Sequence, residues 1–360
     1  MGETVGAPAP VATAVAAAAA SGKPRVAPQM PWRTRLSVLA AGYLTDATRR
    51  ADGSINRRLL SALDPGVRAS PAPRNGVASR DLAIGGAVPV RARLFYPAGG
   101  EAPVPVVVFF HGGGFAYLSA ASPAYDAACR RIARYAGAAV LSVDYRRSPE
   151  HRYPAAYDDG FVALRFLDDP SNHPSSSGGG AAAVPPLDVS RCFLAGDSAG
   201  GNIAHHVARR YALSPPSAFS AVRLAGLVAI QPFFGGEERT PAELRLDGAP
   251  IVSVPRTDWM WRAFLPAGAD RTHEACAPAA AAAGLEAAAR FPAATVVIGG
   301  YDPLQDWQRR YCEALRAAGK EVRVVEYPDA IHAFYVFPEF AESRDLMLRI
   351  KDLVAGGGGK

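Results

Sequence analysis

The chain has little cysteine, and its cysteines show no spacing typical of a metal or disulfide site. Structural zinc sites and disulfide frameworks need closely spaced or numerous cysteines, and no C-x-x-C pair occurs here, so neither is indicated. The four cysteines are Cys129, Cys192, Cys276 and Cys312. Cys192 falls in an apolar run and is expected in the core. A reducing compartment is therefore expected, namely the cytoplasm with access to the nucleus left open.

The amino-terminal segment lacks a long hydrophobic run. Its apolar stretch, Val11–Ala20, is shorter than the roughly 20 residues that a membrane-spanning helix needs. Glu3 stands where a secretion signal would carry Lys or Arg, and the start Met1–Gly6 lacks the Ser or Thr of a myristoylation site. We expect no membrane association and a disordered Ala- and Pro-rich tail over residues 1–30, whose composition leaves a plastid address open.

The charge distribution does not indicate a nucleic-acid-binding protein. The net charge is +6, and residues 1–100 hold thirteen Lys or Arg against five Asp or Glu, so the remainder is close to neutral. A nucleic-acid groove needs a wide basic patch with interleaved aromatic residues, whereas this excess reads as a solvated face. No nucleic acid is expected as a partner, and no protein partner is evident.

Ser198 is the centre of the G-x-S-x-G pentapeptide Gly196–Gly200. The apolar run Cys192–Ala195 precedes it and the helix-like stretch Asn202–Ala208 follows, which is the strand, turn and helix of a nucleophile elbow. Glycine is needed on both sides because a β-carbon there would collide with the neighbouring backbone. The pentapeptide also arises by chance in a chain with 35 glycines, so further features are needed.

A glycine triplet follows the strongly apolar run Val104–Phe110. The sequence His111-Gly112-Gly113-Gly114 frees the backbone to point several N–H groups into one volume, as an oxyanion hole requires. The alternatives are a flexible loop or a phosphate cradle, but no G-K-[ST] follows and the triplet is tied to a buried strand. His111 is expected to hold the shape of this loop.

Asp302 and His332 complete the constellation in chain order. Asp302 follows the apolar strand Ala294–Ile298; it could be only a helix N-cap, and its neighbour Asp306 is expected inside the next helix. His332 follows the short strand Val322–Tyr327 in the loop that begins at Pro328. The order Ser, Asp, His is that of α/β hydrolases and differs from those of the chymotrypsin and subtilisin types.

These motifs resemble those of plant carboxylesterases of the hormone-sensitive-lipase-like group of α/β hydrolases, which are relatives of the gibberellin receptors. The motifs are His111–Phe115, Asp144–Arg146, Pro149–Asp159, Gly196–Asn202, Asp302–Leu304 and His332–Phe334. The resemblance implies Ser198 as nucleophile, Asp302 as orienting acid and His332 as base. It also implies that the amides of Gly113, Gly114 and Ala199 form the oxyanion hole. The receptors carry an aliphatic residue in place of the histidine, so His332 favours an enzyme.

Alternating apolar and helix-like stretches predict an α/β-hydrolase fold with a mostly parallel sheet and helices on both faces. Strands are predicted at Arg91–Tyr96, Val104–Phe110, Ala138–Val143, Arg191–Ala195, Leu224–Ile230, Thr295–Ile298 and Val322–Tyr327. Helices are predicted at Tyr125–Tyr135, Ala156–Leu167, Asn202–Tyr211 and Pro303–Ala318. A single domain is expected over residues 31–355, with a flexible insertion at Asp168–Pro186. Glu150 and His151 are expected in a structural ion cluster with the arginines around them.

The amphipathic pattern of Pro31–Leu60 predicts helix, and in the family this region resembles the lid over the acyl pocket. The predicted division is a lid segment at residues 31–75 and a catalytic core at 76–355; a helix pair that merely packs on the domain is the other interpretation, compatible with the first. Aromatic residues expected near the pocket are Trp32, Tyr43, Phe115, Phe233, Trp259, Trp261 and Tyr335.

The sequence therefore predicts a serine carboxylesterase that acts on small-molecule esters. The chemistry requires no metal ion and no organic cofactor. Two alternatives belong to other classes: a receptor-like protein that binds a small molecule with weak or no hydrolysis, and a peptidase on the same fold. A peptidase usually carries an extra domain that screens its substrates, and no change in composition marks one here.

Overall fold

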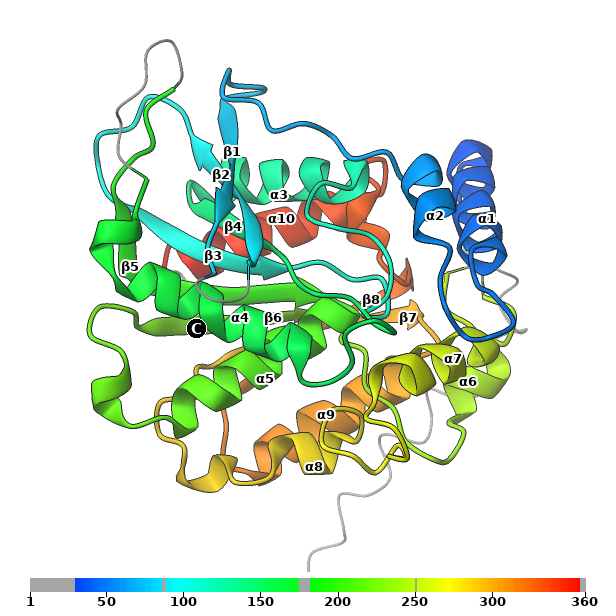
Figure 1. Ribbon diagram of the computed structural model, residues 1–360. Coiled ribbons are helices and arrows are strands. Elements are labelled where there is room, and N and C mark those ends of the chain that lie inside the picture. Colours follow the sequence, from blue (N-terminus) through cyan, green and yellow to red (C-terminus); the bar gives the residue numbers. More distant parts are fainter. Residues whose placement is uncertain (1–29, 86–88, 175–181, 250, 357–360) are drawn as a thin grey trace, which may run out of the picture.

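A single sheet of eight strands organises the molecule (Figure 1). The computed structural model describes residues 30–85, 89–174, 182–249 and 251–356. The strands are β1 (Val77–Ala83), β2 (Arg91–Pro97), β3 (Val104–Phe110), β4 (Ala139–Asp144), β5 (Leu187–Asp197), β6 (Leu224–Ile230), β7 (Ala294–Tyr301) and β8 (Val322–Ile331). Their order is β1-β2-β4-β3-β5-β6-β7-β8, and only the pairings of β2 with β1 and β4 are antiparallel. The predicted mostly parallel sheet is confirmed.

Helices cover both faces of this sheet. α3 (Pro123–Ala136) and α10 (Ala341–Val354) pack together on one face. α4 (Ala155–Asp168), α5 (Ala199–Leu213), α8 (Pro278–Ala282) and α9 (Gln305–Ala317) lie on the other face. Each face has its own buried apolar cluster, one containing Ile132 and Ile350 and the other Ile203 and Leu315. Burying an aliphatic side chain of this size contributes roughly 1.5–3 kcal/mol, so the two clusters hold the sheet in place.

The segment before β1 forms two helices at one end of the molecule, α1 (Trp32–Ala47) and α2 (Arg57–Leu63). They lie near α6 (Pro241–Arg245) and α7 (Val254–Phe264). Asp46 of α1 accepts from the Arg256 guanidinium of α7 at 2.7 Å, and Arg57 donates to the Ser148 carbonyl at 2.6 Å. Val38 of α1 faces inward and is buried. The helix pair is therefore fastened to the body by both charge and apolar contact.

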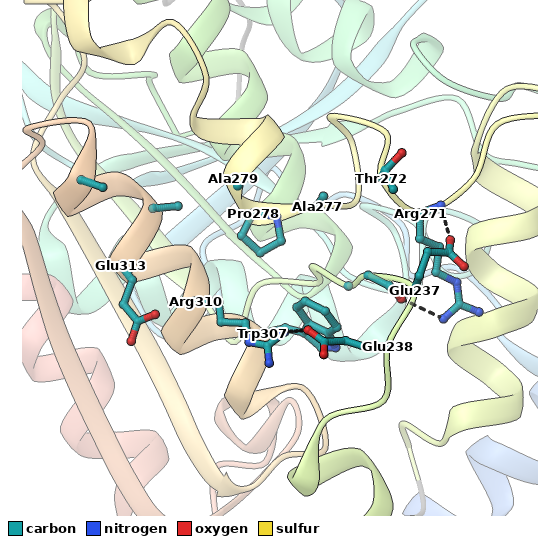
Figure 2. A pocket seen from close by; sticks show the side chains of 14 residues that line it. Glu237, Glu238, Arg271, Thr272, Ala277, Pro278, Ala279, Trp307, Arg310 and Glu313 are labelled. Carbon is teal, nitrogen blue, oxygen red and sulfur yellow. Dashed lines mark hydrogen bonds and ion pairs between the residues drawn. The ribbon is translucent and has the colours of Figure 1, made fainter.

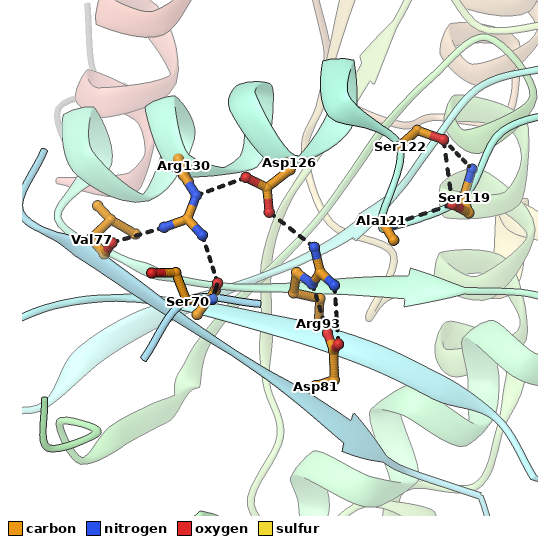
Figure 3. A network of polar contacts seen from close by, with 10 residues as sticks. Ser70, Val77, Asp81, Arg93, Ser119, Ala121, Ser122, Asp126 and Arg130 are labelled. Atoms are coloured by element: carbon orange, nitrogen blue, oxygen red, sulfur yellow. Dashed lines mark hydrogen bonds and ion pairs between the residues drawn. The ribbon is translucent and has the colours of Figure 1, made fainter. Parts of the chain in front are cut away.

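A buried ion network ties α3 to the antiparallel edge of the sheet (Figure 3). Asp126 of α3 accepts from Arg93 of β2 at 3.0 Å and from Arg130 of its own helix at 2.8 Å. Arg93 also donates to Asp81 of β1 at 2.6 Å, and Arg130 donates to the Val77 carbonyl at 2.9 Å. This network fixes the position of α3, the helix that carries Tyr125 to the centre of the molecule.

Several predictions of local structure need correction. The strand β8 continues to Ile331, where a loop from Pro328 was expected, because β7 is also longer and pairs Tyr301 with Ile331 beyond an irregularity. The edge strand β1 was not predicted, nor were α6, α7, α8 and α10. Glu150 pairs with Arg57 of α2 at 2.5 Å, so its partner is a distant arginine and not a neighbour in sequence.

All four cysteines are buried and unpaired, including Cys192 as predicted. The predicted tail at residues 1–30 lies outside the described residues except for its last residue, and so does most of the glycine- and serine-rich insertion, residues 175–181. No helix among the described residues is long and apolar enough to span a bilayer.

Candidate active site

Ser198 occupies a strained turn between β5 and α5. Its backbone has φ 51° and ψ −121°, a conformation that residues with side chains seldom adopt. The turn is held on both sides, because the Ser198 N–H donates to the Ile230 carbonyl and its carbonyl accepts from Phe233 N, both at 2.9 Å. A β-carbon on Gly200 would overlap the Phe110 carbonyl oxygen, and one on Gly196 would overlap the Gly200 backbone. Close packing of strand and helix therefore requires both glycines.

The glycine triplet lies at the end of β3, beside the serine turn. Gly113 and Gly114 have φ values of 102° and 58°, in the region that favours glycine. Gly113 offers its carbonyl to the N–H groups of Ala116 and Tyr117. In the described part of the chain the N–H groups of Gly113 and Gly114 have no acceptor, and both residues line the cavity that contains Ser198. Ala199, directly after the serine, is the buried first residue of α5, where the helix dipole is positive.

His111 is enclosed behind this loop. Its Nδ1 is 2.8 Å from the Gly112 carbonyl oxygen, and its ring stacks on Tyr145 with centroids 4.2 Å apart. Burial lowers the pKa of His111 to about 4, so the ring is neutral at physiological pH. A neutral, stacked imidazole fits the expected role of supporting the loop.

Asp302 and His332 form a buried hydrogen-bonded pair. His332 Nδ1 lies 2.8 Å from Asp302 Oδ2, and the carboxylate also accepts from Leu304 N at 2.9 Å. Burial acts to lower the pKa of His332, but the charge and hydrogen bond of Asp302 outweigh it, with help from Asp197, and the net shift is upward. Asp306 lies in α9 as expected. Its carboxylate accepts from the Ala242 N–H at 2.8 Å, so it binds the first turn of α6 and not His332.

Sequence reasoning missed Asp197. This residue precedes Ser198, is buried, and accepts hydrogen bonds from Gly112 N at 2.9 Å and from the Tyr125 hydroxyl at 3.0 Å. Burial raises the pKa of Asp197 to about 6, against the opposing effects of the nearby Tyr335 and Tyr125 hydroxyls and of His332. The signal in the sequence was an acidic residue at the end of a buried strand. A buried carboxylate destabilises the fold unless hydrogen bonds or a charged partner compensate it, so such a residue indicates a specific role.

A cavity of about 490 Å³ joins these parts. Ser198, His332, Gly113 and Gly114 all line it, and Asp302 lies behind the histidine. Small side chains of helix α1 form one wall of the cavity, and side chains of α7 form a second. Aliphatic and aromatic side chains from other segments form a third wall. The main residues of these walls are Val38, Ala41, Gly42, Thr45, Ile251, Thr257, Met260, Leu118, Val336 and Phe337. A substrate here would meet mostly apolar surface.

Of the aromatic residues expected near the pocket, one lines the cavity itself, and the others lie behind its lining or on the outer surface. Phe233 lines the cavity, whereas Trp32 and Tyr43 are exposed on the outer side of α1. Trp259 contacts Tyr117, a cavity residue, at a ring distance of 5.8 Å. The other three are enclosed in the packed core, namely Phe115, Trp261 and Tyr335. Helical periodicity gives the spacing of such residues but not which side of the helix meets the body.

A second cavity, of about 660 Å³, lies beside α8 and α9 (Figure 2). None of the predicted site residues lines it. Most of its charged side chains have partners: Arg310 pairs with Glu238, Glu237 accepts from the Arg271 N–H at 2.7 Å, and the Arg271 guanidinium pairs with Asp258 outside the cavity. Arg310 also covers the face of Trp307, with 4.6 Å between its guanidinium carbon and the ring centre. Among the described residues no serine, cysteine or histidine lines this cavity, so the serine cavity is the candidate active site.

No cluster of three or more metal-binding side chains occurs among the described residues. The chemistry available in the serine cavity is that of an alcohol, an imidazole, a carboxylate and backbone amides. Such a set can activate a hydroxyl and stabilise an oxyanion, which are the two requirements of acyl transfer.

Comparison with known proteins identifies the family. Residues 107–336 match the family model described as alpha/beta hydrolase fold, and the chain belongs to this family. The gibberellin receptor GID1C of Arabidopsis thaliana is 43% identical over 304 residues, covering 81% of this chain and 84% of the receptor. Carboxylesterase 20 of the same plant is 34% identical over 319 residues, covering 84% and 93%. The resemblance to plant carboxylesterases and gibberellin receptors is thus confirmed.

Solved structures agree with this assignment. An esterase of Pyrobaculum calidifontis superposes with a TM-score of 0.66 at 27% identity, covering 92% of this chain and 95% of the esterase. The predicted α/β-hydrolase fold is therefore confirmed at the level of the family and of the architecture.

Proposed function

We propose that this protein is a serine carboxylesterase that hydrolyses small, mainly apolar carboxylic esters through an acyl-enzyme. The observation that carries the proposal is the buried Asp302–His332 hydrogen bond beside a cavity that His332 shares with Ser198. The similarity to carboxylesterase 20 and to the Pyrobaculum esterase supports the same activity. The mostly apolar walls of the cavity favour uncharged acyl and alcohol groups.

In the first half of the proposed reaction His332 acts as general base. Its Nδ1–H is donated to Asp302, so Nε2 carries the lone pair that accepts the Ser198 proton. The Ser198 oxygen then bonds to the ester carbonyl carbon, and the carbonyl oxygen becomes negative. The amides of Gly113, Gly114 and Ala199 are proposed to donate to that oxygen.

In the second half the imidazolium returns its proton to the departing alkoxide. The bond between the carbonyl carbon and the alcohol oxygen breaks, and the acyl group remains on Ser198. Water enters, His332 takes one of its protons, and the resulting hydroxide attacks the acyl carbon. Collapse of this second intermediate releases the carboxylic acid and returns the proton to Ser198, so the enzyme ends as it began.

The proposed division of the chain is a lid at residues 31–75 over a catalytic core at 76–355. The small residues of α1 that face the cavity and the Asp46–Arg256 ion pair support it. A closed lid excludes water, which strengthens the electrostatic contacts around the reacting carbonyl. Four buried, unpaired cysteines fit a reducing compartment such as the cytoplasm.

A second candidate function is that of a receptor, similar to the gibberellin receptors, which here would bind a small molecule without turnover and present α1 to a protein partner. Two observations favour it: the 43% identity to such a receptor and a row of exposed apolar side chains on the outer side of α1. These side chains are Trp32, Leu36, Leu39 and Tyr43, each at least half exposed. His332 favours the esterase, because a binding protein needs no base.

Hydrolysis of p-nitrophenyl acetate tests the two functions against each other. The esterase proposal expects wild-type turnover that Ser198→Ala abolishes, while the surface variant Ser190→Ala serves as the matched control and keeps full rate. Equal hydrolysis by wild type and Ser198→Ala removes the esterase proposal. A series of esters of increasing acyl length then defines how much of the cavity the substrate fills.

A further inference from the structure

Gln231 fastens the backbone on both sides of His332. This residue directly follows β6 and is fully buried. Its Oε1 accepts from the Ala333 N–H at 2.8 Å, and its Nε2 donates to the Ile331 carbonyl at 3.1 Å. One side-chain amide thus holds the residues immediately before and after His332, so the segment that carries the imidazole cannot turn without breaking a buried hydrogen bond.

The surroundings are built to keep Gln231 in this position. Its backbone has φ 45°, an uncommon conformation for a residue with a side chain, and its N–H donates to the Val297 carbonyl of β7 at 2.8 Å. A β-carbon on Gly299 would lie 2.5 Å from Gln231 Nε2. Glycine at position 299 therefore leaves the space that the amide occupies between β7 and the histidine segment.

Gln308 holds the other member of the pair. It lies in α9, is fully buried, and donates from Nε2 to Asp302 Oδ2 at 2.8 Å, the same oxygen that binds His332 Nδ1. Its Oε1 has no partner within the described residues. Reversing the amide would bring Oε1 against the carboxylate, so the observed orientation is the favourable one. A buried carbonyl oxygen without a hydrogen bond destabilises the fold. The unpaired Oε1 of Gln308 is therefore the cost of directing its Nε2 to Asp302.

We infer that Gln231 and Gln308 are positioning residues of the proposed esterase, Gln231 through the backbone around His332 and Gln308 through the Asp302 carboxylate. Together they leave the imidazole one orientation toward Ser198. The inference rests on the proposed function, because it concerns how the base is held for that reaction. Neither glutamine touches the substrate cavity, so both act through their neighbours.

The two residues have different electrostatic consequences. The charged groups that act on His332 are Asp302 and Asp197. Gln308 spreads the Asp302 charge by donating to it, so removing that donor concentrates the charge on the oxygen that faces His332 and favours the imidazolium. Gln231 contacts only backbone groups next to His332, so its loss misdirects the ring and leaves the charge around it unchanged.

The experiment compares Gln231→Met and Gln308→Met with wild type by kcat, KM and pH dependence on p-nitrophenyl acetate. We expect kcat to fall roughly 10-fold to 100-fold in both, with KM within about twofold, because orientation and not binding is lost. In Gln308→Met we also expect the acid midpoint of kcat/KM to rise by about half a pH unit, because the lost hydrogen bond no longer competes with His332 for Asp302. NMR titration of the His332 imidazole should show the same rise.

Tyr211→Phe is the matched control, since it removes one buried hydrogen bond, to the Val222 carbonyl, near the end of α5 opposite Ser198. It should lower thermal stability without moving kcat or the midpoint. Folded methionine variants with wild-type kcat and midpoint overturn the inference. Should they fail to fold, Gln231→Leu and Gln308→Leu, which also remove the amide without adding a charge, decide it: a lowered kcat in both with a raised midpoint only in Gln308→Leu supports the inference, and wild-type values overturn it.

The inference and the proposed function fail in different ways. Absence of hydrolysis by wild type defeats the esterase proposal, and the NMR titration of His332 then still tests whether Gln308 tunes the pair. If the glutamine variants hydrolyse the ester as fast as wild type, the esterase proposal stands and the positioning roles of Gln231 and Gln308 are wrong.

Discussion

The carboxylate of Asp197 accepts the Gly112 N–H at 2.9 Å, so the residue before the candidate nucleophile is bonded directly to the glycine loop. Tyr125 of α3 strengthens the link, because its hydroxyl donates to Asp197 at 3.0 Å and accepts from Gly112 N at 2.8 Å. The strained turn at Ser198 and the loop that begins at His111 come from different strands. This contact fixes their relative position.

Asp197→Asn should make stability less dependent on pH. The pKa of Asp197 is raised to about 6, so between its unfolded value and 6 the folded state binds the proton more tightly and wild-type stability falls as pH rises through that window. Asparagine cannot ionise and can still accept from Gly112. The melting temperature of the variant relative to wild type should therefore be more favourable at pH 8 than at pH 4. An equal difference at both values contradicts the assignment.

The same substitution should move the activity profile. Asp197 contributes to the raised pKa of His332, so its neutral replacement should lower the acid midpoint of kcat/KM. This direction is opposite to that expected for Gln308→Met. Profiles measured for both variants under the same conditions provide the comparison, and shifts of the same sign would contradict this electrostatic picture.

Wild-type activity should depend on the neutral form of His332. Because the pKa of His332 is raised above its usual value of 6.5, kcat/KM should increase with pH through a midpoint above 6.5 and then level off. His332→Gln should lose turnover on the order of 10³-fold or more and show no such midpoint. A pH–rate profile of the two proteins tests this, and a residual midpoint in the glutamine variant would assign the titration to another group.

Gly113→Ala and Gly114→Ala should differ in severity. A β-carbon at Gly113 would overlap the Tyr117 backbone carbonyl, whereas the three atoms nearest to one at Gly114 all belong to the flexible Met260 side chain. Alanine keeps the backbone N–H, but relieving the overlap would displace it; because loss of an oxyanion donor costs on the order of 10²–10³ in kcat, we expect Gly113→Ala to approach that range. Gly114→Ala should be milder and partly restored by Met260→Ala. Steady-state kinetics of the three variants decide it, and equal, unrestored losses would contradict the geometric argument.

Removal of Asp126 should destabilise the fold without touching the cavity. Its side chain is 7% exposed, and Asp126→Ala leaves Arg93 and Arg130 short of a buried partner. Breaking such a pair costs roughly 3–5 kcal/mol. The matched control is Asp158→Ala, which breaks an exposed pair with Arg210 worth about 1 kcal/mol or less. Urea unfolding of both variants gives the comparison, and a loss in Asp126→Ala as small as that expected for the control would contradict a stabilising role of Asp126 in the network of Figure 3.

The sequence predicts the centre of this molecule better than its edges. The run Val104–Phe110 is apolar throughout because β3 is covered on both faces, so its pattern is unambiguous. The edge strand β1, Val77–Ala83, mixes Arg and Asp with apolar residues and has no comparable signal. Helix α8 is a short alanine run without the polar face that marks an amphipathic helix.

The residues of the candidate site also differ in how far the sequence predicts them. The proposed triad, Ser198, Asp302 and His332, could be predicted because each residue follows a strand and their order is typical of the fold. The two glutamines and Asp197 could not, because a single polar residue has no period or motif and its partner is decided by tertiary packing. The cavity walls were also beyond prediction, since the orientation of α1 depends on the contacts that Asp46 and Val38 make with the body.

The most direct test of the proposed esterase is the intact mass of the protein after reaction with an excess of a p-nitrophenyl alkylphosphonate, which traps an activated serine. The account predicts one phosphonyl group on wild type, located to the peptide that contains Ser198, no adduct on Ser198→Ala, and much slower labelling of His332→Gln. Absence of an adduct on wild type, or equal labelling of Ser198→Ala, would contradict it.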